Sequence, residues 1–290
     1  MGFIAKTSLL SDLTVFEAMR RQVIQLPRSA TFDACINRFV KYKVNAVLIT
    51  EADGTPTGVV SKTDVMGAYY AGLSVNTPVE NAMAGPPIFC SPDDTLDSAL
   101  EMMQRQDIYR VFVLDGGEVS GVIAYPDVVG FLYQLCHGCR YSRQNRVHNG
   151  NGPPPLTVKD VMTPSVESYP HDGPLTGIME ALSACRLGAL LITGPDGEPA
   201  GVVSKSDLML AYRHGVDSSE PASSIMGSPV KSCDENEYLE TALRTLIFSQ
   251  IQRIFVHRDE PSRIIGVLSL SDAARIRSGS CKACGISRKM

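Results

Sequence analysis

The stretch GVVSKTD at residues 58–64 occurs a second time, as GVVSKSD, at residues 201–207. The two copies lie 143 positions apart and differ only in Thr63 against Ser206. An apolar run that ends in a hydroxyl, a lysine and an acid is typical of a strand that turns into a helix. A chain that contains the same strand and turn twice is predicted to be built from internal repeats.

Segments that end in methionine give the period of the repeat. VFEAM ends at Met19 and VKDVM at Met162, whereas VENAM ends at Met83 and SSIM at Met226. The offset between the two halves is 143 residues in both cases, and the offset within each half is 64 residues. The sequence therefore predicts four copies of a unit of roughly 60 residues, and because so small a unit buries too little surface alone, the copies should pair.

Each copy is predicted to contain a helix, two hairpin strands and a second helix, after a short leading strand such as VESYP at 166–170. TLDSALEMMQRQ at 95–106 has helical apolar spacing, whereas RVFVLD at 110–115 and ALLIT at 189–193 are short, branched runs followed by turn residues. Asp64 and Asp207 are expected to open the second helices. The expected fold class is α/β, in the α+β sense.

We expect two modules of two copies each. The first spans 1–138, with copies at about 10–74 and 75–138, and the second spans 157–290, with copies at about 157–217 and 218–280 followed by a tail that contains a C-x-x-C pair. The segment 139–156 is polar and rich in glycine, asparagine and proline, and it is predicted to be a linker.

Composition argues against polyanions and membranes as partners. The 27 lysines and arginines against 31 acidic residues give a net charge of −4, which does not attract nucleic acid. No window approaches the roughly 18 apolar residues of a membrane span. We expect a cytoplasmic protein whose thiols are reduced.

Several motifs together resemble one known family. KDVMTPSVESYP at 159–170, the strand pair around an apolar GxxS turn, and S-x-x-D leading into a helix look like the cystathionine-β-synthase (CBS) domain, in four copies that cover nearly the whole chain. The resemblance implies that motifs pair into modules whose clefts bind adenosine-containing ligands such as AMP, ADP or ATP. It further implies a homodimer that regulates another protein, as yet unknown.

The S-K-S-D pattern itself suits a sugar phosphate. A hydroxyl, helix N–H groups and a carboxylate form a compact polar cluster at the positive end of a helix dipole, although serine and aspartate can also act only as helix caps. The candidate residues are Ser61, Lys62 and Asp64 in the first copy, Ser204, Lys205 and Asp207 in the third, and Ser269 and Asp272 in the fourth. The second copy has Ala124 and Pro126 before Asp127, so we expect its cleft to be vacant.

In the resembling family an arginine before the partner's strand often reaches the phosphate. The matching positions are Arg110 and Arg253, which are 143 residues apart, whereas the other copies have Asn45 and Gly188. The resemblance implies that Asp64 is served by Arg110 and Asp207 by Arg253, with the Asp272 cleft ranked third. Alternatively, the arginines are exposed edge charges. Adenine is expected near Thr163, Val166 and Ala189.

The cysteines fall outside this resemblance. Cys136 with Cys139 and Cys281 with Cys284 form C-x-x-C pairs, each nine residues after the aspartate of an even-numbered copy. If the two pairs meet, four thiolates would suit tetrahedral zinc or an iron–sulfur cluster; otherwise they are exposed dithiols. Cys35, Cys90, Cys185 and Cys233 have apolar neighbours and are expected in the core.

Three functions remain after this reading. No Walker loop, dinucleotide fingerprint, nucleophile elbow or H-E-x-x-H pattern occurs in the sequence. The leading hypothesis is a non-catalytic sensor that binds adenine nucleotides and signals by conformational change. The alternatives are a redox or metal sensor that uses the four cysteines, and a hydrolase that uses a carboxylate.

Overall fold

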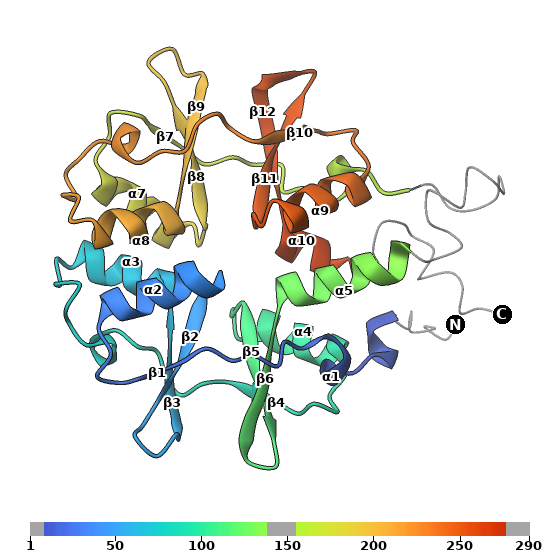
Figure 1. The fold of residues 1–290 in the computed structure, drawn as a ribbon. Helices are drawn as coiled ribbons and strands as arrows, with labels where there is room; N and C mark the ends of the chain where they lie inside the picture. Colours follow the sequence, from blue (N-terminus) through green and yellow to red (C-terminus); the bar gives the residue numbers. More distant parts are fainter. Residues whose placement is uncertain (1–8, 138–154, 277–290) are drawn as a thin grey trace. The chain divides into compact units, whose positions relative to one another are not determined.

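The computed structural model describes residues 9–137 and 155–276 (Figure 1). Within these residues each repeat has the predicted order of a short strand, a helix, two strands and a second helix. The first repeat contains β1 (Gln25–Pro27), α2 (Phe32–Tyr42), β2 (Ala46–Thr50), β3 (Pro56–Ser61) and α3 (Lys62–Tyr70). The second contains β4 (Phe89–Cys90), α4 (Leu96–Arg105), β5 (Arg110–Asp115), β6 (Glu118–Ala124) and α5 (Tyr125–His137).

The second half of the chain repeats this order. The third repeat contains β7 (Ser168–Pro170), α7 (Leu175–Ala184), β8 (Ala189–Thr193), β9 (Pro199–Ser204) and α8 (Lys205–Arg213). The fourth contains β10 (Ser232–Asp234), α9 (Leu239–Phe248), β11 (Arg253–Arg258), β12 (Glu260–Ser269) and α10 (Leu270–Arg275). Short helical segments precede the repeats: η1 (Leu9–Asp12), α1 (Val15–Ala18), η2 (Val79–Asn81), η3 (Val158–Asp160) and η4 (Ala222–Ser224).

Each repeat forms its own mixed sheet. The leading strand pairs in parallel with the central strand, and the central strand pairs antiparallel with the last one, as in the orders β1-β2-β3 and β7-β8-β9. The central strand is most buried in the first and third repeats, where all five residues of β2 and four of the five residues of β8 are buried. The predicted hairpin between the two apolar runs is confirmed, and so is the α+β class.

The second helices begin earlier than the sequence suggested. We expected Asp64 and Asp207 to open them, but α3 begins at Lys62 and α8 at Lys205, with Ser61 and Ser204 as N-caps. The aspartates are the third residues of these helices and complete capping boxes with the serines. The serine, not the aspartate, therefore ends each strand and starts each helix.

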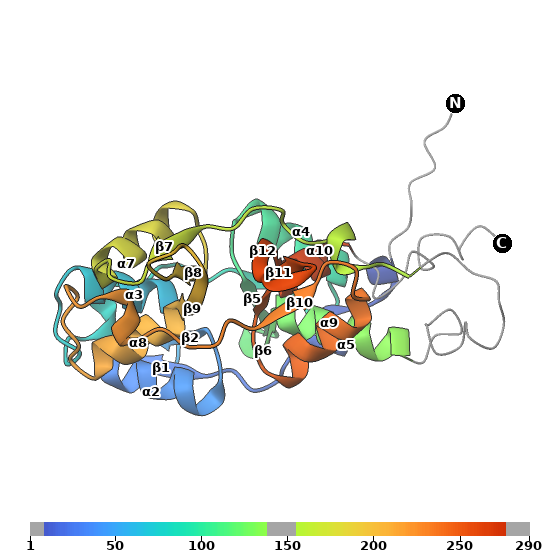
Figure 2. The same cartoon turned by 90° about the horizontal axis from the view of Figure 1, so that it is seen from above.

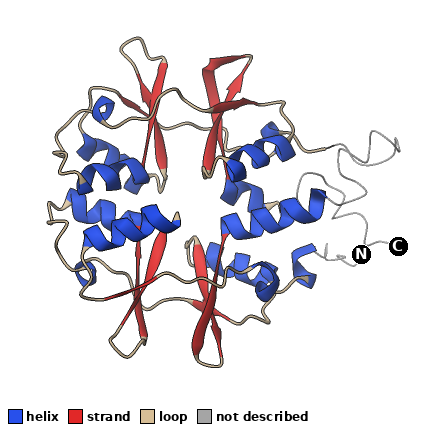
Figure 3. Cartoon of the chain, in the orientation of Figure 1, coloured by secondary structure: helices blue, strands red, loops and turns tan. Residues whose placement is uncertain are grey.

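Two compact units form within the chain, and each takes one repeat from either half. Among the described residues, the 1/3 unit consists of Val23–Pro87 and Val166–Val230, and the 2/4 unit consists of 9–22, 88–137, 155–165 and 231–276. In each unit the helices lie between two sheets (Figure 3). In the 1/3 unit α3 and α8 pack side by side (Figure 2). The core of this unit therefore joins segments from both halves, including Phe32, Val65, Leu175 and Leu208.

The 2/4 unit has a second core of the same kind. Leu96, Leu100, Leu239 and Leu243 are buried there on α4 and α9. Leu156, the last residue of the predicted linker, is also buried in this core, and its carbonyl accepts a 2.9 Å hydrogen bond from the Leu239 N–H. The rest of that linker, except Pro155, lies outside the described residues, and the predicted division into two modules near 139–156 stays a prediction.

A contact between glycine and methionine explains why both residues recur. The glycine before the last apolar residues of each hairpin faces the sulfur of a methionine that follows a short helical segment of the same unit. A Cβ on the glycine would come within 2.6–2.9 Å of that sulfur, closer than real contacts allow. The pairs are Gly58 with Met83, Gly121 with Met19, Gly201 with Met226, and Gly266 with Met162.

Three of the four isolated cysteines are core residues, as predicted. Cys35, Cys90 and Cys233 are buried, and desolvation raises the pKa of each thiol to about 12. Thiols with so high a pKa are unreactive at neutral pH. The prediction for Cys185 was wrong, because this residue caps the C-terminus of α7 and is exposed, whereas Leu182 is the residue that faces the core.

The described helices can be compared with the length and apolar character that a membrane span requires. None of those within residues 9–137 and 155–276 is long and apolar enough to cross a bilayer.

Candidate functional site

The S-x-x-D sequence forms the same polar cluster in three repeats. The N–H and the hydroxyl of Ser61 donate to Oδ2 of Asp64 at 2.6 and 2.7 Å. The corresponding distances from Ser204 to Asp207 are 2.8 and 2.6 Å, and those from Ser269 to Asp272 are 2.9 and 2.6 Å. The helix-cap role that the sequence allowed is therefore present. In this state each serine hydroxyl donates to its own aspartate.

The aspartates keep acceptor capacity beyond the cap. Within the described part of the chain, no hydrogen bond to Oδ1 of Asp64 or Asp207 is found, and both side chains belong to half-buried residues. Burial raises the pKa of Asp64, while hydrogen bonds from Ser61 and the positive charge of Lys205 lower it. A half-buried carboxylate with one unused oxygen can accept hydrogen bonds from hydroxyl groups of a ligand.

The third site of this kind is less open. Oδ1 of Asp272 lies 3.8 Å from the guanidinium of Arg275, one turn further along α10. The hydroxyl of Ser269 also lies 2.7 Å from that of Ser271. The Asp272 cluster therefore shares its carboxylate with a neighbouring arginine, whereas no ion pair between an arginine and Asp64 or Asp207 is found among the described residues.

The second repeat replaces the serine by an arginine from elsewhere in the chain. Asp127 accepts a 2.9 Å hydrogen bond from the Ala124 N–H and forms a 2.7 Å ion pair with Nε of Arg20, and its side chain is only 10% exposed. Burial raises the pKa of Asp127, and Arg20 and Arg110 lower it. Sequence reasoning missed Arg20.

A signal for Arg20 was present in the repeat. The residue after each repeated methionine forms a backbone bridge to the strand that leads to an aspartate, as Arg20 does with Val122 and Ala84 with Val59. Thr163 and Gly227 hold the equivalent positions beside Val267 and Val202. An alignment of these four positions would have shown that only the one facing the Asp127 motif carries a charged residue.

The two predicted phosphate arginines both lie in the 2/4 unit. Arg253, the first residue of β11, is half-buried, and desolvation lowers its pKa while Tyr109 and Asp272 raise it. Arg110 begins β5, and its charge acts on Asp127. Because Asp64 and Asp207 belong to the 1/3 unit, their predicted pairings with Arg110 and Arg253 stay predictions.

The predicted adenine-binding residues are divided between the units. Thr163 belongs to the 2/4 unit, and its backbone bridge to Val267 places it near the Ser269–Asp272 motif. Val166 and Ala189 belong to the 1/3 unit. Ala189 is paired with Ser204 across the β8–β9 ladder, so it lies beside the Asp207 motif.

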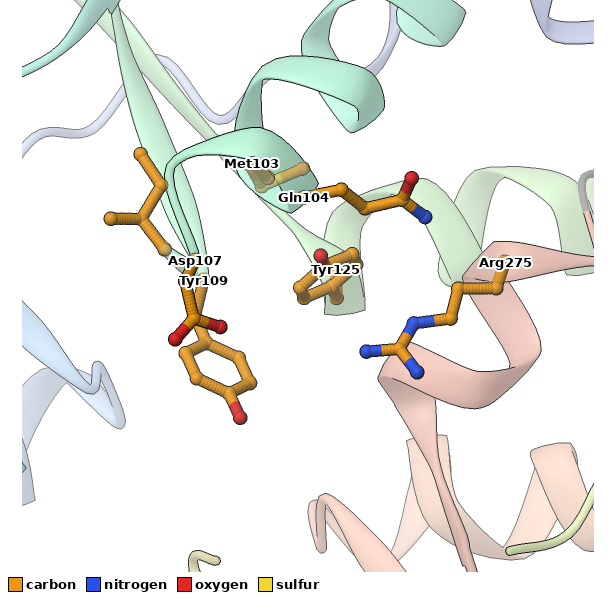
Figure 4. A pocket seen from close by; sticks show the side chains of 7 residues that line it. Met103, Gln104, Asp107, Tyr109, Tyr125 and Arg275 are labelled. Carbon is orange, nitrogen blue, oxygen red and sulfur yellow. The ribbon is translucent and has the colours of Figure 1, made fainter. Parts of the chain in front are cut away.

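Among the described residues the 2/4 unit also contains a small cavity of about 160 Å³ (Figure 4). The cavity lies where the end of α4 meets α5 and α10, and Gln104, Tyr125 and Arg275 point toward it. The rings of Tyr109 and Tyr125 meet edge to face at 5.8 Å. Tyr125 stands where two other repeats have the lysine of S-K-[ST]-D, so an aromatic ring lines this region in place of a cation.

A sequence model of the CBS domain matches residues 11–71, 79–134, 158–214 and 222–279. The chain belongs to the CBS domain family. The family resemblance inferred from the repeats is thereby confirmed, with four CBS motifs in two modules.

Two relatives match more than half of the chain at low identity. Protein MJ1225 of Methanocaldococcus jannaschii is 22% identical over 197 residues, which is 67% of this chain and 68% of that protein. An uncharacterised 33.4 kDa protein from the ribosomal RNA operon of Thermofilum pendens is 23% identical over 180 residues. That match covers 60% of this chain and 56% of the relative, so the chain spans little more than half of it.

Solved structures show the same fold over most of the CBS chain. The structure of MJ1225, described as a candidate archaeal homologue of g-AMPK, has a TM-score of 0.75 at 15% identity, covering 91% of this chain and 99% of that one. A conserved protein from Pyrococcus horikoshii has a TM-score of 0.61 at 18% identity, covering 91% and 100%. At such identities these matches show the fold alone.

The structure does not describe the side chains of the four cysteines of the predicted metal centre. Cys139, Cys281 and Cys284 lie outside the described residues, and so does the side chain of Cys136 at the end of α5. Within residues 9–137 and 155–276, no group of three or more histidine, cysteine or acidic residues could hold a metal ion.

Proposed function

We propose that this CBS protein is a non-catalytic regulator that binds adenine nucleotides, AMP, ADP or ATP, at its S-x-x-D motifs. The observation that carries the proposal is the polar cluster of the 1/3 unit. Two copies of it stand at the starts of neighbouring helices, each with a serine, backbone N–H groups, a lysine and a carboxylate oxygen that is not used by the cap.

Each part of this cluster has a role in the proposed complex. The carboxylates of Asp64 and Asp207 accept hydrogen bonds from the ribose hydroxyls through Oδ1, and the helix N–H groups and the lysines face the phosphate. We further propose that Arg110 and Arg253 bind phosphate, as the family resemblance implies, and that Thr163, Val166 and Ala189 lie near the base. The Ser269–Asp272 motif provides the third site.

Signalling requires that the nucleotide binds two conformations with different affinity. We therefore propose that bound nucleotide shifts the equilibrium between two packings of the CBS motifs, and that a second protein reads the result. A homodimer is the expected state of the chain, and light scattering coupled to gel filtration tests it with and without nucleotide.

Thermal unfolding tests the nucleotide proposal. A ligand that binds only the folded chain adds about 2.7 kcal/mol to stability at 100 times its dissociation constant. We expect AMP, ADP or ATP to raise the melting temperature by several degrees. GMP is the control for the base, and it should give a smaller shift.

Variants locate the effect. Asp207→Ala and Asp64→Ala should each reduce the stabilisation by nucleotide, and Asp207→Ala/Asp64→Ala should remove most of it. Asp196→Ala, an exposed aspartate in the turn between β8 and β9, is the matched control and should leave the shift unchanged. No shift with any adenine nucleotide, or an unchanged shift in the double variant, would contradict the proposal.

A further inference from the structure

The lysines of the two S-K-[ST]-D motifs in the 1/3 unit reach across to each other's helix. Nζ of Lys62, the first residue of α3, donates to the hydroxyl of Ser206 on α8 at 2.8 Å. Nζ of Lys205, the first residue of α8, donates to the hydroxyl of Thr63 on α3 at 2.9 Å. The two bonds are reciprocal, because each joins the first residue of one helix to the second residue of the other.

These hydroxyls lie in the first turn of the opposite helix. The N–H of Thr63 donates to the Ser61 hydroxyl and that of Ser206 to the Ser204 hydroxyl, both at 3.2 Å. The ammonium group of Lys205, which is bound to Thr63, therefore lies beside the serine and the backbone of the first motif. The backbone of Lys205 itself belongs to the third motif. An ammonium has three donors, so it can keep this bond and still bind an oxygen of a ligand.

Electrostatics agree with this crossed placement. The positive charge of Lys205 lowers the pKa of Asp64, which burial raises. Lys205 is half-buried, so its interaction with Asp64 is screened less than that of an exposed pair. A cation that acts on the first motif's carboxylate thus comes from the third motif.

We propose that the two motifs of the 1/3 unit exchange their lysines, so that Lys205 binds the phosphate held at Ser61–Asp64 and Lys62 binds the phosphate held at Ser204–Asp207. This inference rests on the proposed nucleotide function and adds the assignment of each cation to a site. It has a regulatory consequence. Each site contains a lysine whose backbone belongs to the helix of the other motif, so a ligand bound at one site engages a residue of the other motif, and the two sites are coupled.

Single-site forms of the full chain test the assignment. Asp207→Ala/Asp272→Ala leaves the first motif intact, and Asp64→Ala/Asp272→Ala leaves the third. Lys62→Met and Lys205→Met are then introduced separately into each form, because methionine keeps the apolar stem and removes the charge. Binding of AMP, ADP and ATP is measured by isothermal titration calorimetry.

In the form that keeps Asp64, Lys205→Met should raise the dissociation constant about tenfold or more, as expected for a lost charge-assisted hydrogen bond, and Lys62→Met should change it much less. In the form that keeps Asp207 the two effects should be exchanged. The lysine variants lose one equivalent hydrogen bond each, so they serve as stability controls for one another. If either methionine variant fails to fold, glutamine, which retains a donor without the charge, allows the same comparison.

Two results distinguish the inference from the function on which it rests. If nucleotide binds but the lysine within the same motif has the larger effect, or the two lysines have equal effects, the exchange is wrong and the nucleotide function stands. If the wild-type chain binds no adenine nucleotide, the proposed function fails and the exchange fails with it.

Discussion

The 1/3 unit and the 2/4 unit share one backbone frame but differ in the chemistry at their helix starts. In the 1/3 unit S-K-[ST]-D stands at the start of both second helices, and each lysine donates a hydrogen bond to the other helix. In the 2/4 unit A-Y-P-D stands at the start of α5, with Asp127 bound by Arg20, and S-L-S-D stands at the start of α10. The contact between glycine and methionine is nevertheless the same in all four motifs. Packing therefore preserves the repeat, while the polar residues at the sites are free to differ.

Arg20 is the residue that separates the units most clearly, because the equivalent position in the first S-x-x-D cluster is Ala84. Arg20→Ala should destabilise the chain by about 2 kcal/mol, since it leaves a buried carboxylate without its ion-pair partner. Urea denaturation measures the loss. Arg20→Ala/Asp127→Asn should recover most of the stability, because the orphaned charge is then absent. An Arg20→Ala variant as stable as the wild type would show that the ion pair does not distinguish the units.

The pH dependence of that variant sharpens the comparison. Burial raises the pKa of Asp127 above the ordinary 3.8, and Arg20 opposes the rise, so removing Arg20 should raise this pKa further. A carboxyl group whose folded pKa exceeds its unfolded value binds more protons in the folded state, and the free energy of unfolding falls as pH rises through that interval. The cost of Arg20→Ala should therefore be small near about pH 4 and complete at about pH 7. A cost that does not vary between these values would assign the loss to packing.

The shared frame can be tested with one glycine from each unit. Gly121→Ala and Gly201→Ala should each destabilise the chain by about 1–2 kcal/mol, because the new Cβ meets a methionine sulfur and a backbone carbonyl. Chemical denaturation gives both values. Similar losses would confirm that the frame is the same in the two units, whereas a loss in one unit only would show that their packing differs.

Much of the fold could be predicted because each repeat packs in the same way, and the residues needed for this packing recur at regular intervals in the sequence. The 143-residue and 64-residue offsets gave the four motifs, and RVFVLD and ALLIT proved to be β5 and β8 with unchanged ends. The helix starts were misplaced by two residues, since Ser61 and Asp64 can each act as a cap and only the backbone conformation decides between them.

The site was harder to predict because its parts come from separate segments. The serine and aspartate lie three residues apart and were found from their spacing. The crossing of Lys62 and Lys205 depends on how α3 packs against α8, and the pairing of Arg20 with Asp127 joins residues 107 positions apart. Spacing along one repeat contains no information about either contact.

The smallest expected effect concerns helix glycines that have no packing role. Gly67 lies within α3 of the 1/3 unit and Gly130 within α5 of the 2/4 unit, and apart from the adjacent backbone of the same helix a Cβ at either position would meet no atom within 4 Å. Alanine loses less backbone entropy on folding than glycine, so Gly67→Ala and Gly130→Ala should each stabilise the chain by roughly 0.5–1 kcal/mol. Thermal unfolding measures the gain, and the opposite sign at Gly121 and Gly201 provides the contrast. A destabilising Gly67→Ala would show that the space beside this glycine is filled in solution. The packing of α3 against α8, which brings the two lysines together, would then differ from the one described.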